Sequence, residues 1–390
     1  MMFGLGSTMC SQVILKITVS NPSPVGRDME PVVVKWHEVP QAVQRAARER
    51  LRLLDERGCS LAFQIDDVDG DGRPDEMAFV ADLPANGSVG FVLTDTASAL
   101  ASPAGPPSTD AGNWKRVGGK RIPVDDDDGP GLLRSQSSYV FDGAGWESGV
   151  IGYRIYLDER NAIDIQAKRQ RGLHWNFIGS TGIDYQLDAH WGMDVLHVGS
   201  ALGVGGFGFW LADSVVKPFP LERRHTRILT RGPVRSLVQV RYEGWKVGTE
   251  QVDVDLLCTI YTASRESLQK LRIKRSSTKK TIAVGIVKHQ NGTAVRNPEK
   301  GYLFTLGNQS RVNDSLLLAV TAPTGSRITK GPYDHLVLLD VPQNGFLSYG
   351  IISLWEGEEG GMWSREEIER YLTIKALKFS QPLQIRIGKL

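Results

Sequence analysis

Apolar and polar residues alternate along much of the chain, which is the pattern of strands that bury one face and leave the other in water. From about residue 137 onward this pattern recurs with turn signals between the segments, as in QVDVDLLCTIYT and LQKLRIKRS. The spacing is close to the ~8–12 residues typical of antiparallel sandwiches. We therefore predict that residues 132–390 form one large antiparallel β-sandwich domain, within an all-β fold that has few helices.

The beginning of the chain predicts a small N-terminal β unit over residues 11–96. The segments VILKITVS, PVVVKW, LAFQID, MAFVADLP and GFVLTD have the composition of strands, and turn residues separate them. Apolar positions at helical spacing predict a helix over 40–58. A second helix is predicted over 364–377, where Ser364 and Glu367 complete a capping box.

Residues 97–131 separate these two parts of the chain. This stretch is rich in Ala, Ser, Pro and Gly and carries a run of four aspartates. It shows no periodic apolar pattern, so we predict a linker or a surface loop in which the aspartates form a solvated turn. A chain of 390 residues is long enough for the two domains that this division implies.

Net charge, hydropathy and cysteine spacing exclude several classes of binding partner and metal site. The formal net charge is +2, which gives no electrostatic footprint for nucleic acid, and no apolar run reaches the ~18 residues of a membrane helix. The three cysteines, Cys10, Cys59 and Cys258, form neither a disulfide framework nor a zinc motif. We expect free thiols, with a Cys59–Cys258 bridge as the alternative. The sequence leaves the oligomeric state open.

The stretch DDVDGDGRPDE contains the front half of a calcium loop, in which alternate carboxylates turn toward one ion and Gly72 allows the bend. An EF-hand would have Glu where this chain has Ala78, and no helices flank the loop. We predict a structural Ca²⁺ loop between strands. The alternative is an acidic turn whose carboxylates accept the turn's own N–H groups. The predicted metal ligands are Asp67, Asp69, Asp71 and Asp75.

The residue types that carry chemistry concentrate between 134 and 210. Arg154 and Tyr156 are two positions apart, so they should share one face of a strand. The same holds for Asp164 and Lys168, which are four positions apart. Ion pairing between neighbouring strands is the alternative to a substrate site for these groups.

Several longer motifs resemble a known family. WESGVIGYRIYLDERNAIDIQAK, HWGMDVLHVGSALGVGGFGFW, RGPVRSLVQVRYEGW and the acidic loop followed by MAFVADLP are similar to the domain of unknown function 4861 family, over most of the chain. The resemblance implies a galactose-mutarotase-like supersandwich. It also implies a role in bacterial polysaccharide degradation, where part of the family dehydrates the terminal uronic acid of an oligosaccharide before an unsaturated-glucuronyl hydrolase acts.

Family members are usually exported, so the resemblance implies a periplasmic or extracellular location. This sequence departs from the family in its long 97–131 insertion and in the lack of a clear signal peptide. MMFGLGSTM is a short apolar stretch with no basic residue before it. It fits the tail of a signal peptide, a lipoprotein cleavage site at Cys10, or an unstructured N-terminus.

Dehydration of a uronic acid removes the C5 proton and expels the C4 hydroxyl, so it needs a cation at the carboxylate, a base and an acid. We expect Arg154 or Lys168 to hold the carboxylate, His190 to act as base and Tyr185 as acid or its partner. The reaction requires no cofactor. The candidate residues for binding the oligosaccharide substrate are Trp146, Glu147, Tyr156, Asp164, His174, Trp191, Trp210, His289 and His335.

Two other functions remain open at this point. The first is a glycoside hydrolase that uses Glu147 with Asp164 or Asp194, in which a carboxylate separation of roughly 5 Å or of about 6.5–9.5 Å would predict retention or inversion. The second is a glycan-binding protein without activity, in which the aromatic residues form a platform for sugar rings.

Overall fold

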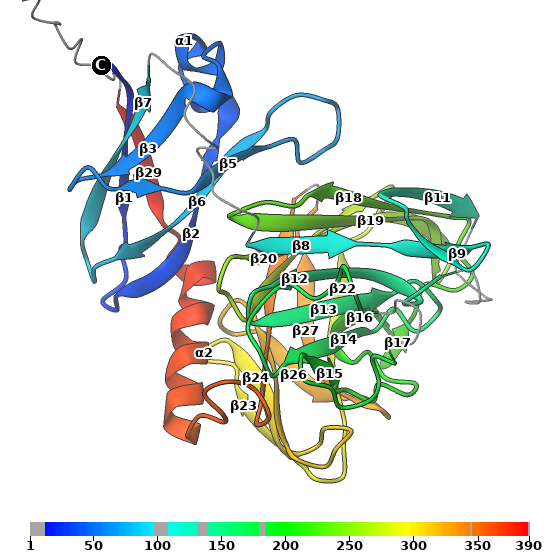
Figure 1. Ribbon diagram of the computed structural model, residues 1–390. Coiled ribbons are helices and arrows are strands. Elements are labelled where there is room, and N and C mark those ends of the chain that lie inside the picture. Colours follow the sequence, from blue (N-terminus) through cyan, green and yellow to red (C-terminus); the bar gives the residue numbers. More distant parts are fainter. Residues whose placement is uncertain (1–11, 97–107, 131–138, 179–183, 344, 389–390) are drawn as a thin grey trace, which may run out of the picture. The chain divides into compact units, whose positions relative to one another are not determined.

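The computed structural model describes residues 12–96, 108–130, 139–178, 184–343 and 345–388 (Figure 1). The chain divides into two compact units. Unit 1 comprises Met1–Pro107, Gly232–Val234 and Gln381–Leu390, and unit 2 comprises Ser108–Arg231 and Arg235–Ser380. The N-terminal stretch with Cys10 lies outside the described residues, as does part of the stretch over 97–131.

Unit 1 consists of a five-stranded sheet in the order β29-β1-β7-β3-β4 and a three-stranded sheet in the order β2-β6-β5. Alternate residues of β1 are buried, among them Leu15, Ile17 and Val19, and they pack with side chains from both sheets. The strands are β1 (Gln12–Ser20), β2 (Arg27–Lys35), β3 (Leu51–Asp55), β4 (Ser60–Leu61), β5 (Phe63–Asp66), β6 (Glu76–Leu83), β7 (Ser88–Asp95) and β29 (Gln384–Gly388).

The prediction of a helix over residues 40–58 was wrong for most of that range. Helix α1 covers only Gln41–Gln44, a 3-10 turn follows, and the strand β3 begins at Leu51. Leu51 and Leu53 are completely buried, and β3 pairs along its length with β7. Burial of alternate residues against the sheet therefore overrides the helical spacing of the apolar positions.

Unit 2 is a large antiparallel sandwich. Its nine-stranded sheet has the order β11-β18-β19-β20-β21-β28-β25-β24-β23, and two five-stranded sheets have the orders β15-β14-β13-β12-β8 and β17-β16-β22-β27-β26. The largest hydrophobic core joins all three sheets, for example through Val240, Trp146 and Phe207. The predicted all-β fold with a large antiparallel sandwich is thus confirmed.

The strands of the two five-stranded sheets are β8 (Thr109–Gly112), β12 (Gly143–Ser148), β13 (Ile151–Tyr156), β14 (Ile163–Lys168), β15 (Gly192–Asp194), β16 (Val204–Leu211), β17 (Ser214–Val216), β22 (Lys280–Val287), β26 (Arg327–Lys330) and β27 (Asp334–Val341). Those of the nine-stranded sheet are β11 (Asp126–Pro130), β18 (Arg223–Thr230), β19 (Arg235–Val247), β20 (Glu250–Tyr261), β21 (Glu266–Lys274), β23 (Gly292–Asn297), β24 (Tyr302–Asn308), β25 (Ser315–Thr321) and β28 (Leu347–Trp355).

The helix predicted over 364–377 is confirmed as α2 (Arg365–Ser380). The capping box forms, because the Ser364 backbone N–H donates to Glu367 at 2.8 Å and the Glu367 N–H donates to the Ser364 hydroxyl at 3.3 Å. Ile368 and Leu372 are buried one helical turn apart and pack against β24, β25 and β28. No described helix has the length and apolar character that crossing a membrane requires.

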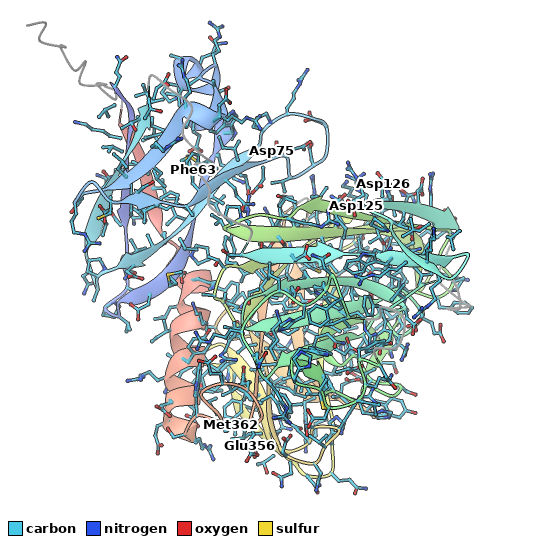
Figure 2. The ribbon with its side chains drawn as sticks, viewed as in Figure 1. Phe63, Asp75, Asp125, Asp126, Glu356 and Met362 are labelled. Carbon is cyan, nitrogen blue, oxygen red and sulfur yellow. The ribbon has the colours of Figure 1, made fainter. Side chains whose placement is uncertain are left out.

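Four short strands lie where the sequence predicted a linker or surface loop, namely β8, β9 (Trp114–Val117), β10 (Lys120–Pro123) and β11. Asp125 and Asp126 begin the aspartate run (Figure 2), and the run continues from Asp126 into β11, which pairs with β18. Asp127 is 5% exposed and forms ion pairs with Arg224 at 3.0 Å and with Lys115 at 2.8 Å. Partners distant in sequence therefore order a stretch that has no periodicity of its own.

The end of the chain also lies where the sequence did not place it. β29 pairs with β1 of unit 1 rather than with the sandwich of residues 132–390. Cys59 is exposed, Cys258 is buried, and both are free thiols, so the bridge between them does not form.

Candidate functional site

One face of the sheet β15-β14-β13-β12-β8 carries mostly polar side chains, and we call it the polar face. The pairing register aligns Asp194, Gln166, Gly152, Glu147 and Asp110 in one row across the five strands. Directly paired residues point to the same side of a sheet. The polar face therefore consists of Asp110, Glu147, Arg154, Tyr156, Asp164, Gln166, Lys168 and Asp194, together with glycines at 112, 143, 145, 152 and 192.

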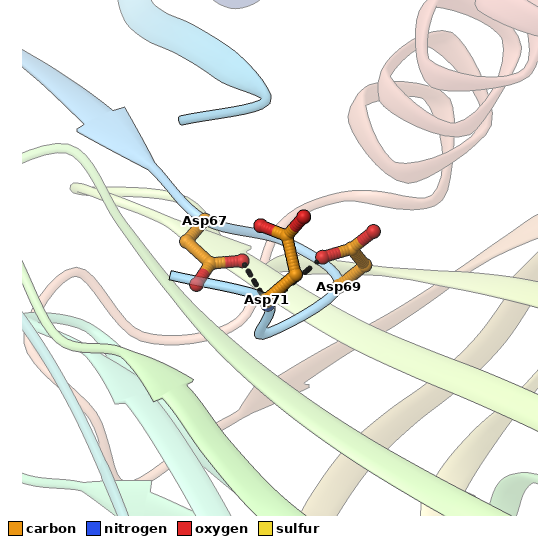
Figure 3. Close-up of side chains that lie close together, drawn as sticks. All are labelled: Asp67, Asp69 and Asp71. Carbon is orange, nitrogen blue, oxygen red and sulfur yellow. Dashed lines mark hydrogen bonds between the residues drawn. The ribbon is translucent and has the colours of Figure 1, made fainter. Parts of the chain in front are cut away.

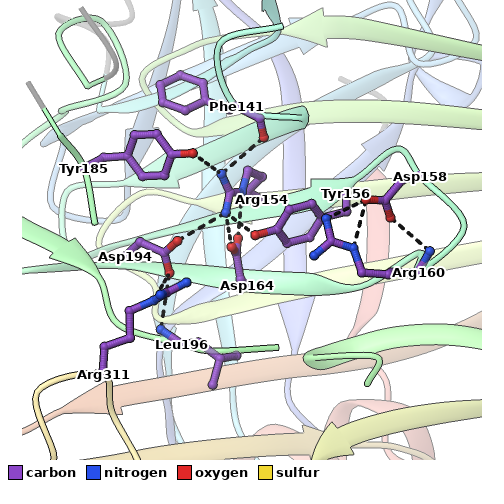
Figure 4. A network of polar contacts seen from close by, with 10 residues as sticks. All are labelled: Phe141, Arg154, Tyr156, Asp158, Arg160, Asp164, Tyr185, Asp194, Leu196 and Arg311. Atoms are coloured by element: carbon purple, nitrogen blue, oxygen red, sulfur yellow. Dashed lines mark hydrogen bonds and ion pairs between the residues drawn. The ribbon is translucent and has the colours of Figure 1, made fainter. Parts of the chain in front are cut away.

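Arg154 is the centre of a buried network on this face (Figure 4). Its guanidinium is 1% exposed, forms a two-point ion pair with Asp164 and lies 3.3 Å from Asp194. It also donates to the Tyr156 hydroxyl at 2.5 Å and to the Tyr185 hydroxyl at 3.3 Å. Arg154 and Tyr156 therefore share one face, as predicted, and the ion pair with Asp164 crosses from β13 to β14.

Asp194 belongs to this network, and its pKa is shifted toward neutral pH. Burial raises the pKa of Asp194 to about 7, the nearby Asp164 acts in the same direction, and Arg154 and Arg311 oppose the shift. The Nε of Arg311 lies 3.5 Å from its Oδ1. A carboxyl group with a pKa near neutrality can serve as general acid or general base.

Tyr185 and His190 come from the segment that leads into β15. Tyr185 is partly exposed, and burial raises the pKa of its hydroxyl although the charge of Arg154 acts in the opposite direction. His190 is exposed, whereas His174 is buried and its burial lowers its pKa. Tyr185 thus contacts the Arg154 network directly. The side chain of His190, on the same segment, is exposed to solvent.

Lys168 and Glu147 form a second buried cluster. The ammonium group of Lys168 donates to Glu147 Oε2 and to the carbonyls of Ser148 and Gly172, each at 2.5 Å. Glu147 Oε1 accepts the backbone N–H groups of His174 at 2.6 Å and Trp175 at 2.7 Å. All three Lys168 protons point at protein oxygens, and each nitrogen of the buried Arg154 guanidinium also donates to a protein oxygen. Of the two cations considered for the substrate carboxylate, only Arg154 contacts a partly exposed hydroxyl, that of Tyr185.

The other predicted substrate-binding residues lie apart from the Arg154 network. Trp146 is completely buried in the sandwich core and donates to the Ser267 hydroxyl at 2.8 Å, so it points away from the polar face. Trp191 is buried beside His174, with ring centroids 5.8 Å apart. These two indoles are enclosed by protein, and neither offers a face for stacking on a sugar.

The last three predicted substrate-binding residues are Trp210, His335 and His289. They lie on the sheet β17-β16-β22-β27-β26 or directly after one of its strands. Trp210 is on β16 and packs beside a small cluster with Leu202. His335 is on β27, where burial and Arg296 at 3.2 Å lower its pKa to about 4. His289 follows β22, is partly buried and has a lowered pKa.

Sequence reasoning missed Asp110 and Gln166 on the polar face and Arg121, whose charge acts on Asp110. Gln166 lies midway between Asp164 and Lys168 in IDIQAK, so the alternation that grouped those two also includes it. Arg121 gave no signal, because it lies in the stretch that was predicted as a linker. Its guanidinium stacks on Trp114 at 3.9 Å and donates to carbonyls at 175, 176 and 178, and thereby fixes that segment.

The acidic loop lies in unit 1, between β5 and β6 (Figure 3). Carboxylate oxygens of Asp67, Asp69 and Asp71 lie within 4.8 Å of one another, a set that suits a hard cation such as Ca²⁺. Asp67 also accepts the backbone N–H groups of Gly70, Asp71 and Gly72, and Asp75 accepts two more. The N–H contacts of the acidic-turn alternative are present, while Ca²⁺ binding stays a prediction, and its fourth predicted ligand, Asp75, is not in the group of three carboxylates.

Comparison with protein families decides the classification. The family model described as "Domain of unknown function (DUF4861)" matches residues 19–385. The chain belongs to this family. The resemblance seen in the sequence motifs is thereby confirmed, and the match includes strands of both units of the DUF4861 chain.

Relatives with names or structures are distant. "Uncharacterized protein P7" of Formosa agariphila is 23% identical over 215 residues, which cover 52% of this chain and 52% of that protein. The match thus spans about half the length of this curated relative. An α-mannosidase from Enterococcus faecalis V583 shares 10% identity at a TM-score of 0.49 over 96% of this chain and 46% of its own.

A further structure, of a protein in the glycosyl hydrolase family 38 from Enterococcus faecalis, shares 10% identity at a TM-score of 0.44, over 96% of the DUF4861 chain and 47% of that protein. At these TM-scores neither likeness carries an argument about activity.

Proposed function

We propose that this DUF4861 chain is a carbohydrate-active enzyme, a carbon–oxygen lyase that removes water from the terminal uronic acid of an oligosaccharide during polysaccharide degradation. The observation that carries the proposal is the contact between Arg154 Nη1 and the partly exposed Tyr185 hydroxyl, beside the titratable Asp194. This arrangement offers a proton donor held next to a fixed positive charge, as the elimination requires.

In the proposed reaction, a base removes the C5 proton of the uronic acid and the C4 hydroxyl leaves as water once it is protonated. The product carries a C4–C5 double bond conjugated with the carboxylate. We assign proton donation to Tyr185 and proton abstraction to His190, which is exposed on the same segment. Arg154 is a positioning residue for Tyr185, and its charge stabilises the negative charge that develops in the transition state.

The test is to incubate the protein with uronic-acid-terminated oligosaccharides and to measure absorbance of the conjugated enoate and the loss of one water by mass spectrometry. Tyr185→Phe should lower kcat by about 10²–10⁴-fold, because one positioned acid is removed. Tyr333→Phe is the matched control, since Tyr333 is 57% exposed in the turn before β27 and should retain the full rate. A Tyr185→Phe variant as fast as the wild type would remove the basis of the proposal.

A glycoside hydrolase is the second candidate. The predicted pairs included Glu147, but Glu147 is bound by Lys168. The pair that favours a hydrolase is therefore Asp164 with Asp194, which both contact Arg154. Burial raises the pKa of Asp194 to about 7, and such enzymes use a carboxyl group with a raised pKa as the general acid. Hydrolysis would release a reducing sugar without a new chromophore, so the same assay separates the two reactions. Binding of the oligosaccharide with no product at all would favour a glycan-binding protein.

Three further properties are part of the proposal. Catalysis needs no cofactor, the acidic loop holds a structural Ca²⁺, and the protein works in the periplasm or outside the cell. The last of these rests on the family resemblance alone, and fractionation of the producing cells tests it.

A further inference from the structure

A run of basic residues spans the end of β21 and its connection to β22. Residues 270–280, KLRIKRSSTKK, carry six lysines and arginines and no acidic residue, although the whole chain is almost balanced at +2. Clusters of this kind are typical of surfaces that bind polyanions, because several positive charges raise the local concentration of an anionic chain. None of these residues belongs to the polar face, so the run needs an explanation of its own.

A cavity of about 400 Å³ lies beside this run. One of its walls is the connection 275–279 together with Lys280, the first residue of β22, and the other is the end of β27 with the two residues that follow it. The pairing of Lys280 with Val341 joins the two walls. Ile273 and Val341 contribute an apolar part of the lining and are 8% and 3% exposed. The volume falls within the ~300–1,000 Å³ that small-molecule sites usually have.

The lining of the cavity is positively charged. Arg275, Lys279 and Lys280 line it, and no residue with a carboxylate is among the described residues of the lining. Each of the three cations has a carboxylate partner outside the lining. The partner of Lys279 is Asp340 at 3.0 Å, and their side chains are 67% and 48% exposed. Exposed ion pairs contribute little to stability, so Lys279 can turn to a bound anion at small cost.

The connection between the two strands already holds one carboxylate, that of Glu250. Its Oε1 accepts the hydroxyl groups of Ser277 at 2.9 Å and Thr278 at 3.0 Å, and Lys280 lies 3.1 Å from its Oε2. Hydrogen bonds from Lys280 and Ser277 lower the pKa of Glu250 to about 2, so these contacts are kept at neutral pH. This wall of the cavity is therefore ordered before a ligand arrives, which reduces the entropy that binding costs.

The lining matches a sugar acid better than a nucleic acid. Proteins that bind single-stranded nucleic acid stack the bases on aromatic side chains, and no aromatic residue is among the described residues that line this cavity. The lining combines aliphatic groups of Ile273, Val341 and Pro342 with the hydroxyls of residues 276–278 and the amide of Gln343. A sugar ring has C–H groups on its faces and hydroxyls on its edge, and the neighbouring cations suit a carboxylate that it carries.

We propose that this cavity is a secondary binding site for a uronic acid residue within an anionic polysaccharide, with Arg275 and Lys279 at the carboxylate. The choice of a uronic acid as the ligand rests on the proposed function. The site is distinct from the proposed centre of reaction, since none of the described residues that line it belongs to the polar face. A second contact of this kind raises the affinity for a long chain, because one bound sugar keeps its neighbours at a high local concentration.

The first experiment measures binding of a long oligogalacturonate to the full chain by calorimetry. The double variant Arg275→Gln with Lys279→Gln should raise the Kd about tenfold or more, because charge-assisted hydrogen bonds to the carboxylate are lost. The matched control is Arg57→Gln with Lys300→Gln, which removes two exposed positive charges away from the cavity lining and should bind like the wild type. Equal losses in the two double variants would reveal general charge attraction only and overturn the site.

Two further measurements separate recognition of the carboxylate from folding and from other polyanions. The Tm of the Arg275 and Lys279 double variant should stay close to that of the wild type, since both side chains are exposed. The wild type should bind the carboxyl-reduced oligosaccharide about tenfold more weakly than the oligogalacturonate, and the double variant should not distinguish them. Tighter binding of a sulfated glycan or of single-stranded DNA than of the oligogalacturonate would overturn the assignment to a uronic acid.

The outcomes for this site and for the proposed function can be told apart, because binding is measured without turnover. Binding that depends on Arg275 and Lys279, without any enoate, would support the site and refute the lyase activity. Enoate formation together with an oligogalacturonate Kd that is the same in the wild type and the double variant would support the activity and refute the site.

Discussion

Lys168 and Glu147 form a buried ion pair, in which each side chain is only 1% exposed. Burial raises the pKa of Glu147 and lowers that of Lys168, and their mutual attraction opposes both shifts. Lys168→Met should lower the free energy of unfolding by about 3–5 kcal/mol, because it leaves the Glu147 carboxylate buried without its counter-charge. Denaturant titration followed by tryptophan fluorescence measures this loss.

Arg171→Met is the control for that prediction. Arg171 pairs with Glu359 at 3.5 Å, but both side chains are more than 60% exposed, at 63% and 64%. Exposed pairs contribute about 0–1 kcal/mol, so the control should be close to the wild type. Similar losses for the two variants would show that the burial of Lys168 does not determine its contribution.

Asp194 makes stability depend on pH in a direction opposite to that of most carboxylates. Its folded-state pKa is raised above 3.8 to about 7, so the folded protein holds this proton more tightly than the unfolded chain. The stabilising contribution is fully present at low pH and is lost as pH rises through about 7. Asp194→Asn cannot lose a proton, so its stability relative to the wild type should increase between about pH 4 and pH 7.

Urea unfolding of wild type and Asp194→Asn at several pH values in that range measures the difference. Parallel stability curves for the two proteins would contradict the raised pKa. The activity of the wild type over the same range shows whether the protonated form of Asp194 is also the active one.

The acidic loop is an element whose order comes from its own carboxylates. Asp67 accepts N–H groups from Gly70, Asp71 and Gly72 at 2.5–3.2 Å, so it closes the loop without help from an ion. Asp67→Ala should therefore lower the stability of the protein by about 1–2 kcal/mol even with a chelator present. Thermal unfolding in EDTA measures this, and Arg73→Ala, an exposed side chain of the same loop, is the control.

Calcium adds a second, separate effect to the same experiment. If the loop binds Ca²⁺, the wild type should gain Tm when calcium is added and Asp67→Ala should not, because an ion that binds only the folded state stabilises it. A loss in Asp67→Ala that appears only with calcium would contradict the role of the N–H contacts.

At the scale of the whole molecule, unit 1 is built from both ends of the described chain. β29 adds to the edge of β1, with Lys16 opposite Gly388 and Ser20 opposite Gln384. Ending the chain at Ser380 should expose the edge of β1 and speed hydrogen exchange of its backbone amides, while amides of the nine-stranded sheet keep their protection.

Hydrogen exchange read by mass spectrometry resolves the two units. Gln384→Ala is the control, because its side chain is exposed and the backbone pairing of β29 is retained. Faster exchange throughout both units in the shortened chain would mean that β29 stabilises more than unit 1.

The alternation of residue types was enough to predict the strands, the sandwich and the common face of Arg154 and Tyr156, because side-chain direction in a strand is a local property with a period of two. Local spacing misled at 40–58, where Leu51 and Leu53 are buried by pairing with β7. The sequence motifs also determined the family, since the DUF4861 match covers both units.

Only the tertiary structure decided which strands pair and which charges are buried. Arg121 and Asp127 come from a stretch without periodicity, and partners far along the chain order both of them. Lys168 and Trp146 have the residue types of a binding site, but the first is neutralised by Glu147 and the second faces the core. Burial depends on residues that are remote in sequence and near in space, so no local pattern could have revealed it.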